Sequence, residues 1–200
     1  MKKLLLAVVV LALVGLTNTM NAAGKMSLSV GPDVLIPVGT FGDGWSTGFG
    51  GSVRGQYDVD PMFSLGLTVG YYTWSGKDVA GFKFPTLSGL PIRAFGKYYF
   101  MPEGKARFYG MAELGMFFSS TDDQTYPNPF AGLPGQPATI TVAGSSSSDF
   151  NYAPGVGVEL PLGSGNSKID ISARYDVIAT SGSSSSNFAG RVGINFGLGN

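Results

Sequence analysis

The feature that most constrains this chain is an alternation of apolar with small or polar side chains, repeated in eight long segments. Successive side chains of a β-strand point to opposite faces of its sheet, so a two-residue period predicts strands whose faces meet different environments. In the clearest segment, Leu65, Leu67 and Val69 share one face and are separated by small or hydroxyl-bearing residues. The predicted strands cover 26–38, 48–59, 62–73, 88–100, 107–119, 149–161, 168–178 and 187–198.

The length of these segments favours strands that cross a membrane. Each segment has 11–13 residues. Strands of globular proteins usually have about 5–6 residues, and tilted transmembrane strands have about 9–11. After residue 24 the chain has no apolar run of about 18 residues, the length from which a transmembrane helix is inferred.

Aromatic side chains on the apolar faces gather near the two ends of the predicted strands, and aliphatic side chains occupy the middle. Two aromatic belts around an aliphatic waist are typical of barrels whose rims lie at the two interfaces of a bilayer. One expected belt contains Phe49, Tyr71, Trp74, Phe118, Phe150, Tyr152 and Phe188. The other contains Tyr57, Phe63, Tyr98, Phe100, Phe108 and Phe196, and the waist includes Val53, Leu67, Ala94, Ala112, Val158, Ile171 and Val192.

The opposite faces carry nearly all the charge of the predicted strands, among Gly, Ser and Ala residues. Small residues beside long ionic side chains suit a narrow lumen, where they leave room for the charged groups. The charged residues on these faces, six of each sign, are Asp33, Arg54, Asp58, Arg93, Lys97, Arg107, Glu113, Glu159, Asp170, Arg174, Asp176 and Arg191. The structural charge network expected in this lumen is formed by Arg54, Arg93, Lys97, Glu113, Glu159, Asp170, Arg174 and Arg191.

The connections between the predicted strands alternate between short and long, as in an outer-membrane-type barrel. Short connections lie at 58–61, 101–106 and 162–167, and longer loops are expected at 39–47, 74–87, 120–148 and 179–186. An even number of strands places both ends of the barrel domain on the side of the short turns. The serine runs 145–148 and 183–186 fall in the long loops and predict flexible solvated spacers, whereas 139–142 predicts a strand extension.

The last predicted strand adds a second signal. In 191–198 a polar residue is followed two positions later by glycine, and two large apolar residues alternate near the end. With the strand pattern before it, this stretch resembles the small eight-stranded outer-membrane β-barrel family, the OmpA/OmpX-like and opacity-like proteins often described as porin-like. The residues similar to the family's assembly signal are Arg191, Gly193, Phe196 and Leu198. Two further residues follow Leu198, where many members of the family end on an aromatic residue.

The resemblance covers essentially the whole of 24–200. It implies an all-β, eight-stranded antiparallel up-and-down transmembrane β-barrel in the bacterial outer membrane. It also implies contact with outer-membrane lipid, insertion by the barrel-assembly machinery, and a barrel that is a monomer.

The first residues predict export. A basic tripeptide precedes the apolar run 4–16, which is too short for a transmembrane helix of about 20 residues. Small residues follow, as they do at the cleavage site of a secretory signal peptide. We therefore expect a signal peptide at 1–23, cleaved after Ala22 or Ala23, and a barrel domain at 24–200.

Composition excludes several classes of chemistry. The chain has no Cys and no His, which removes thiolate metal sites, thiol nucleophiles and every mechanism that needs an imidazole. Basic and acidic residues balance at 13 each, so the chain has no basic footprint for nucleic acid. Asp122, Asp123 and Asp149 do not follow the spacing of a calcium-binding loop. We therefore expect no enzyme activity and no catalytic, cofactor or metal site.

Two function hypotheses remain open. In the first, the protein is a structural or surface-interaction protein that displays four outer loops to an extracellular ligand of unknown chemistry. In the second, it is a narrow porin-like channel for small solutes. Eight strands enclose an interior that side chains just fill, which favours the first hypothesis. A secreted, soluble lipocalin-like barrel is a third hypothesis, disfavoured by the aromatic belts and the charged lumen.

Overall fold

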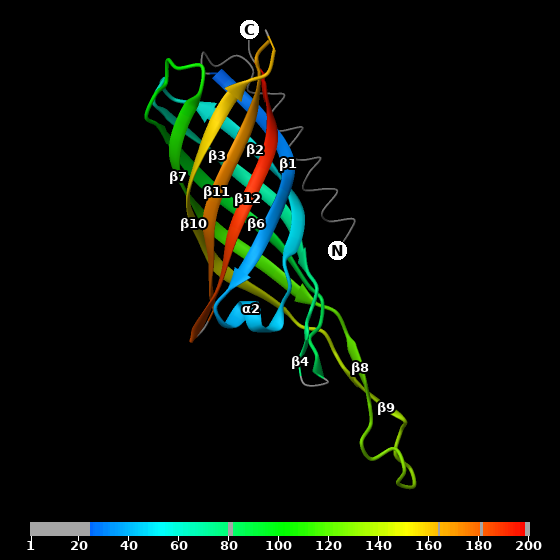
Figure 1. Ribbon diagram of the computed structural model, residues 1–200. Coiled ribbons are helices and arrows are strands. Elements are labelled where there is room, and N and C mark those ends of the chain that lie inside the picture. Colours follow the sequence, from blue (N-terminus) through cyan, green and yellow to red (C-terminus); the bar gives the residue numbers. More distant parts are fainter. Residues whose placement is uncertain (1–24, 80–81, 164, 181, 199–200) are drawn as a thin grey trace.

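Eight long strands form a closed antiparallel barrel in the computed structural model, which describes residues 25–79, 82–163, 165–180 and 182–198. The order of strands around the barrel is β1-β12-β11-β10-β7-β6-β3-β2, so each long strand pairs with the next one in the chain, and β12 closes the barrel on β1 (Figure 1). This arrangement confirms the predicted up-and-down barrel. The expected signal peptide and its cleavage site lie outside the described residues.

The long strands begin and end within a few residues of the predicted segments. They are β1 (Lys25–Val38), β2 (Gly48–Asp58), β3 (Phe63–Trp74), β6 (Leu87–Tyr99), β7 (Arg107–Thr121), β10 (Ser146–Pro161), β11 (Ser167–Thr180) and β12 (Ser183–Gly197). The short connections β2–β3, β6–β7 and β10–β11 lie at one end of the barrel, here called the turn end. The opposite end is called the loop end.

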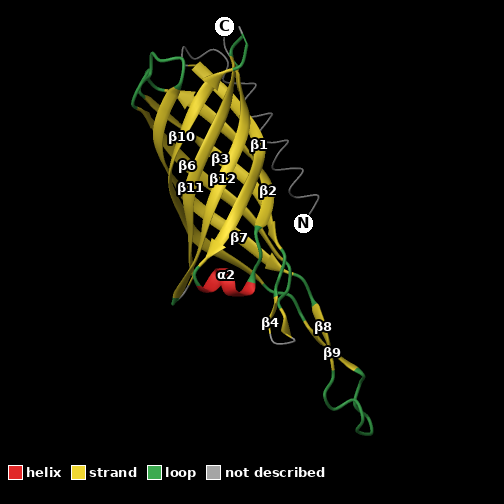
Figure 2. Cartoon of the chain, viewed as in Figure 1, coloured by secondary structure: helices red, strands yellow, loops and turns green. Residues whose placement is uncertain are grey.

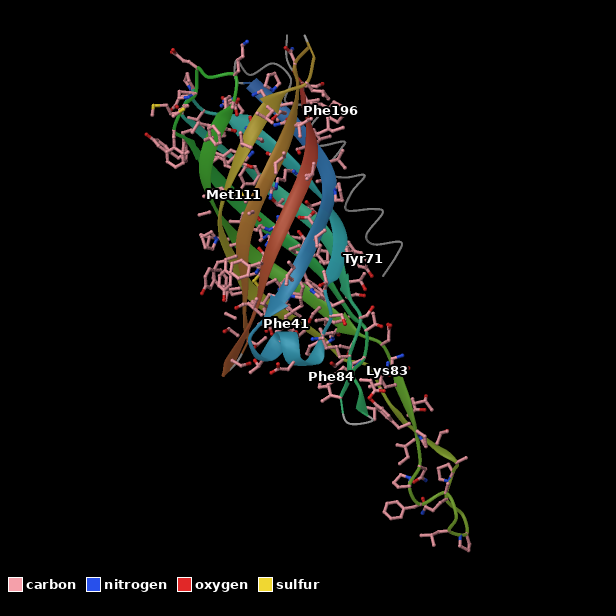
Figure 3. All side chains as sticks on the ribbon, viewed as in Figure 1. Phe41, Tyr71, Lys83, Phe84, Met111 and Phe196 are labelled. Atoms are coloured by element: carbon pink, nitrogen blue, oxygen red, sulfur yellow. The ribbon has the colours of Figure 1, made fainter. Side chains whose placement is uncertain are left out.

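The two faces of the wall differ as the alternation predicts. On β3, Leu67 is 59% exposed on the outside, whereas the neighbouring Thr68 is fully buried inside. The outward aromatic residues of both predicted belts are exposed, with Phe49 and Phe100 each at 59%. Phe196, near the turn end, belongs to the second belt (Figure 3). The outer surface of the barrel is therefore an apolar girdle.

The placement of Trp74 in the outer belt is wrong. Trp74 is completely buried, because it lies an even number of residues from Thr68 and Tyr72 and so shares their inward face. Its ring contacts those of Phe41 and Phe117, at centroid distances of 5.9 and 6.1 Å. Trp74 thus closes the loop end from inside.

The predicted loop at 179–186 and both serine spacers are also wrong. β11 continues to Thr180 and β12 begins at Ser183, so two residues make the connection, and Gly182 adopts a positive φ of 83°. Ser147 pairs with Ser119 of β7, and Ser185 pairs with Ile178 of β11. Serine carries no apolar periodicity to mark a strand, yet its backbone forms the ladder like any other residue.

The remaining elements all lie at the loop end (Figure 2). They are helix α2 (Thr40–Gly44) and the short strands β4 (Asp78–Val79), β5 (Phe82–Lys83), β8 (Gln124–Pro127) and β9 (Thr139–Val142). β9 pairs with β8 in a separate two-stranded sheet, which projects beyond the barrel as a long hairpin (Figure 1). In the described part of the chain, no helix is long and apolar enough to cross a membrane.

Replacing Leu67 by Arg is expected to lower the free energy of unfolding by about 2–4 kcal/mol, because the charge would enter hydrocarbon near the middle of the bilayer. Urea titration of the protein folded in lipid vesicles measures this loss. The matched control is Ile140→Arg in the projecting hairpin, where the side chain is 44% exposed and a surface substitution changes stability by about 0.5 kcal/mol or less. Equal losses at the two positions would contradict the assignment of the outward face to lipid.

Candidate functional site

The lumen is the candidate site, and its inward glycines make room for the large side chains that fill it. A Cβ added to Gly66 would overlap the ring of Phe95, and one added to Gly157 would overlap the phenol of Tyr109. On β12, a Cβ at Gly193 would overlap the guanidinium of Arg191. The small residues of the polar faces therefore hold space for aromatic and ionic neighbours.

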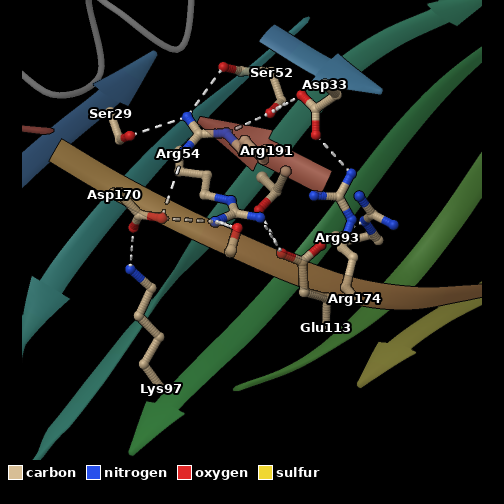
Figure 4. Close-up of polar contacts among 12 residues, drawn as sticks. Ser29, Asp33, Ser52, Arg54, Arg93, Lys97, Glu113, Asp170, Arg174 and Arg191 are labelled. Carbon is tan, nitrogen blue, oxygen red and sulfur yellow. Dashed lines mark hydrogen bonds and ion pairs between the residues drawn. The ribbon is translucent and has the colours of Figure 1, made fainter. Parts of the chain in front are cut away.

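A pair of arginines shares one glutamate at the centre of the lumen. Glu113 on β7 lies 3.0 Å from Nη2 of Arg54 and 2.8 Å from Nε of Arg93 (Figure 4). All three side chains are almost completely buried, with at most 1% exposed. Since an unpaired charge in such a place costs several kcal/mol, each of these groups depends on the others.

Towards the loop end, the network continues through Asp176 and Asp33. Oδ1 of Asp176 accepts hydrogen bonds from Arg93 at 2.9 Å and from Arg174 at 3.0 Å. Arg174 also donates to Oδ1 of Asp33 at 2.7 Å and to the hydroxyl of Tyr72 at 2.8 Å. The second oxygen of Asp33 accepts a bond of 2.6 Å from the hydroxyl of Ser52. This branch ties β1, β2, β3, β6 and β11 together.

Towards the turn end, Lys97 on β6 bridges two carboxylates. Its Nζ lies 3.0 Å from Glu159 on β10 and 2.8 Å from Asp170 on β11. Tyr99 donates to Glu159 at 2.7 Å, and Tyr109 donates to Asp170 at 2.8 Å. The same two tyrosine rings pack against each other at a centroid distance of 5.6 Å.

Asp170 joins these branches into one network. Its Oδ1 lies 3.8 Å from Arg54 and 3.9 Å from Arg191. Arg191 in turn donates to the hydroxyls of Ser52 and Ser29, at 2.9 Å each (Figure 4). The polar contacts thus run continuously through the lumen from the Lys97 bridge to the Asp33 branch.

The structure brings together all eight residues of the predicted network. Asp33 and Asp176 join them, whereas Asp58 and Arg107 lie at the turn-end rim with a weak contact of 4.0 Å. Among the described residues, the buried charged side chains balance at five basic and five acidic: Arg54, Arg93, Lys97, Arg174 and Arg191, with Asp33, Glu113, Glu159, Asp170 and Asp176. The buried charges of the network therefore balance.

The charge pattern did not identify the neutral partners of the network or one further cation. They include Ser29, Ser52, Tyr72, Tyr99, Tyr109, Asn151 and Lys168, whose Nζ lies 3.3 Å from Glu159. Each lies on the inward face by the same two-residue count that placed the charged residues, and that count is the signal that could have found them.

An apolar and aromatic cluster covers the loop end of the charged region, and a second cluster packs among the charges towards the turn end. At the loop end, Phe41 of α2 lies against the barrel interior (Figure 3), in a buried cluster with Leu35, Tyr72, Trp74, Phe117, Ile178 and Ala189. Towards the turn end, Tyr99, Tyr109 and Met111 form a second buried cluster. The interior is filled along its length by side chains.

The acidic loop residues do not gather into a site. Oδ1 of Asp123 accepts a bond of 2.7 Å from the backbone N–H of Gly144, and Asp149 accepts one of 2.6 Å from Ser147. Across the described ranges, no group of three or more His, Cys, Asp or Glu residues is arranged to hold a metal ion.

Comparison with solved structures identifies the fold. Neisserial surface protein A is 16% identical, with 85% of this chain and 94% of that chain covered and a TM-score of 0.56. The outer membrane protein OprG from Pseudomonas aeruginosa is 10% identical, with coverage of 89% and 97% and a TM-score of 0.56. The fold is that of the small eight-stranded outer-membrane β-barrels.

A third structure extends this likeness to another lineage. A major outer membrane protein from Thermus thermophilus is 17% identical to this barrel, with 88% of this chain and all of that chain covered (100%) and a TM-score of 0.55. No family model and no curated protein matches the sequence. At these identities, the likeness concerns the eight-stranded fold alone.

The residues of the expected assembly signal occupy both faces of the last strand in this barrel. Arg191 points into the lumen, and Gly193 provides the space beside its guanidinium. Phe196 and Leu198 are exposed on the outside, at 43% and 38%. Lumen packing accounts for the first two residues, and recognition of the motif by the assembly machinery stays a prediction.

Replacing Arg174 by Ala is expected to lower the free energy of unfolding by up to about 3–5 kcal/mol, because the buried carboxylates of Asp33 and Asp176 lose a cationic partner. Adding Asp33→Asn to the Arg174→Ala variant should recover part of this loss, since the neutral amide removes the buried negative charge that had lost its cation. A double-mutant cycle in urea measures the coupling between the two residues.

The matched control for this cycle is Arg107→Ala at the turn-end rim. Arg107 is 14% exposed and lies 3.7 and 4.0 Å from its two carboxylate partners, so we expect a loss of about 1 kcal/mol or less. A loss at Arg107 equal to that at Arg174, or strictly additive effects of Arg174→Ala and Asp33→Asn, would contradict the network.

Proposed function

We propose that the protein is a closed, monomeric β-barrel of the bacterial outer membrane that anchors and displays a surface-interaction region at its loop end. The observation that carries this proposal is the filled lumen. Five buried basic and five buried acidic side chains form one network in the barrel, an apolar cluster covers it at the loop end, and a second cluster packs among its charges towards the turn end. An interior of this kind serves the stability of the wall and leaves function to the surfaces outside the membrane.

The apolar girdle supports the location in a membrane. Outward side chains such as Leu67, Val156 and Val192 are 52–61% exposed, and a soluble protein rarely exposes a continuous apolar surface of this extent. With the short turns towards the periplasm, as is usual for such barrels, the loop end faces the outside of the cell. Insertion by the barrel-assembly machinery belongs to the same proposal.

The β8–β9 hairpin is the main candidate for the displayed surface. Its tip is ordered by Asn128, which is buried and donates to the carbonyl of Pro137 at 2.7 Å while accepting from the N–H of Phe130 at 2.9 Å. Phe130 and Leu133 are nevertheless 60% and 57% exposed. The stretch 124–144 contains no charged residue. A preorganised, uncharged tip with exposed apolar side chains is suited to contact a protein partner.

The alternative, a narrow channel for small solutes, requires a continuous path past the buried ion pairs. Such a path would separate charges that lie within 3.0 Å of each other, at a cost of several kcal/mol for each group left unpaired. An enzymatic function is not part of the proposal, since the buried carboxylates of the network are held by cations and the chain has no His or Cys.

The purified protein is expected to produce no stable conductance in planar lipid bilayers, because the ion-pair network leaves no open path. A general porin reconstituted in the same way shows that the assay detects open pores. Stable single-channel steps from the wild-type protein would overturn the closed barrel and favour the channel.

Display of the hairpin is tested on intact cells with an epitope tag inserted between Gly132 and Leu133. We expect antibody labelling without permeabilisation, because the tip projects from the loop end. The matched control carries the same tag after Gly104, in the short connection at the turn end, and should be labelled only after permeabilisation. The reverse pattern would contradict the proposed orientation.

A further inference from the structure

The wall of the barrel has interruptions in its strand pairing where prolines occur. Between β10 and β11, Tyr152 pairs with Val177 and Gly155 pairs with Arg174, but the two pairs between them are missing. Pro154 lies in this gap, and proline has no N–H to donate to the neighbouring strand. The register is the same on both sides of the gap, so the wall stays closed but is locally short of hydrogen bonds.

An apolar groove of about 480 Å³ lies over this gap on the outside of the barrel. Small outward residues, Ala173 and Gly190, form its floor with Pro154, and larger side chains stand around them. The larger residues are Ile36, Val156, Tyr175 and Phe188. The Tyr175 and Phe188 rings lie 5.1 Å apart. The groove is shallow and open to the outside of the barrel over most of its extent.

The groove is blind. Behind it, Ala153 is completely buried, and Arg174 and Asp176 are held together at 3.0 Å within the lumen network. A molecule in the groove would therefore contact the outer wall and would not reach the interior. The site is suited to binding, and it offers no lateral route into the barrel.

The height of the groove indicates which part of a bilayer it meets. Tyr175 lies four residues from the waist residue Ile171, and Phe188 lies four residues from Val192, in both strands towards the loop end. Four residues span roughly 13 Å along the strand at ~3.3 Å per residue, which the strand tilt reduces to about 10 Å along the bilayer normal. Under the orientation proposed above, the groove therefore lies in the outer leaflet, between the aliphatic waist and the aromatic belt to which Phe188 belongs.

We propose that this groove binds one acyl chain of an outer-leaflet membrane lipid, an inference that rests on the proposed membrane location. A flexible hydrocarbon chain can lie between the aromatic and branched side chains and cover the small residues of the floor. The convex surface of a second barrel would touch the surrounding side chains and leave the floor uncovered. The lining offers an acyl chain an apolar contact surface at the point where the strand pairing is interrupted.

Gly190→Leu fills the groove without disturbing the wall, because a Cβ at Gly190 meets no other atom within 4 Å. Gly55→Leu is the matched control. Gly55 is also an outward glycine with no atom within 4 Å of an added Cβ, and it lies on β2 outside the groove. Both variants gain the same side chain on the outer face of the wall, and only Gly190→Leu places it in the groove.

The test uses the wild type and both variants, folded into vesicles of either phosphatidylethanolamine or phosphatidylcholine with identical acyl chains. Each protein is then transferred to mild detergent and weighed by native mass spectrometry. We expect one retained phospholipid on the wild type and on Gly55→Leu, equally with both headgroups, and about tenfold lower retention on Gly190→Leu.

The possible failures are distinguishable. If the wild type inserts into the vesicles but retains no more phospholipid than Gly190→Leu, the acyl-chain site is wrong. A dimer of the wild type that Gly190→Leu abolishes would also overturn it, in favour of a second copy of the chain as the occupant. A wild-type protein that does not insert into vesicles at all would contradict the proposed membrane function instead.

Discussion

Backbone hydrogen bonding is the constraint on which the rest of this structure depends. A polar backbone group surrounded by hydrocarbon has no water to bind, so a sheet that crosses a membrane must close on itself. Here the closing contact joins β1 to β12, which lie at opposite ends of the described chain and pair from Ser27 with Gly197 to Val38 with Ser186. Prolines such as Pro154 interrupt the ladder locally and leave the register unchanged. Closure therefore tolerates a missing bond, and an open edge would leave a whole row unpaired.

Closure on eight strands also determines what the interior can be. The enclosed space is narrow enough for side chains to fill it, and the inward glycines allow Arg191, Phe95 and Tyr109 to lie across their neighbours. Charges placed there must pair, and they do so without a net excess of either sign. The stability of the wall therefore depends on how the lumen is filled, whereas the β8–β9 hairpin forms a separate sheet that projects beyond the barrel (Figure 1).

The sequence predicts the strands well because their signal is local. Each long strand repeats its two-residue alternation over its own length, so the segments and their outward faces follow without knowledge of the neighbours. The errors have equally local causes. Trp74 is aromatic and lies at a strand end, like a belt residue, but its position in the two-residue alternation of β3 puts it on the inward face. The run Ser183–Ser186 has no apolar periodicity, and only its pairing with β11 shows that it is a strand.

The sequence by itself determined the all-β class, the eight strands, their two faces and the ten charged residues that are buried in the lumen, since each depends on composition and short-range period. Only the tertiary structure decided which acid meets which base. Arg174 reaches Asp33, 141 residues away, and Lys97 lies between carboxylates of β10 and β11. The same is true of the Phe41 cap and of the groove beside Pro154. These contacts join residues on different strands or across the lumen. Their distances depend on barrel closure and strand register, which cannot be read from the local sequence.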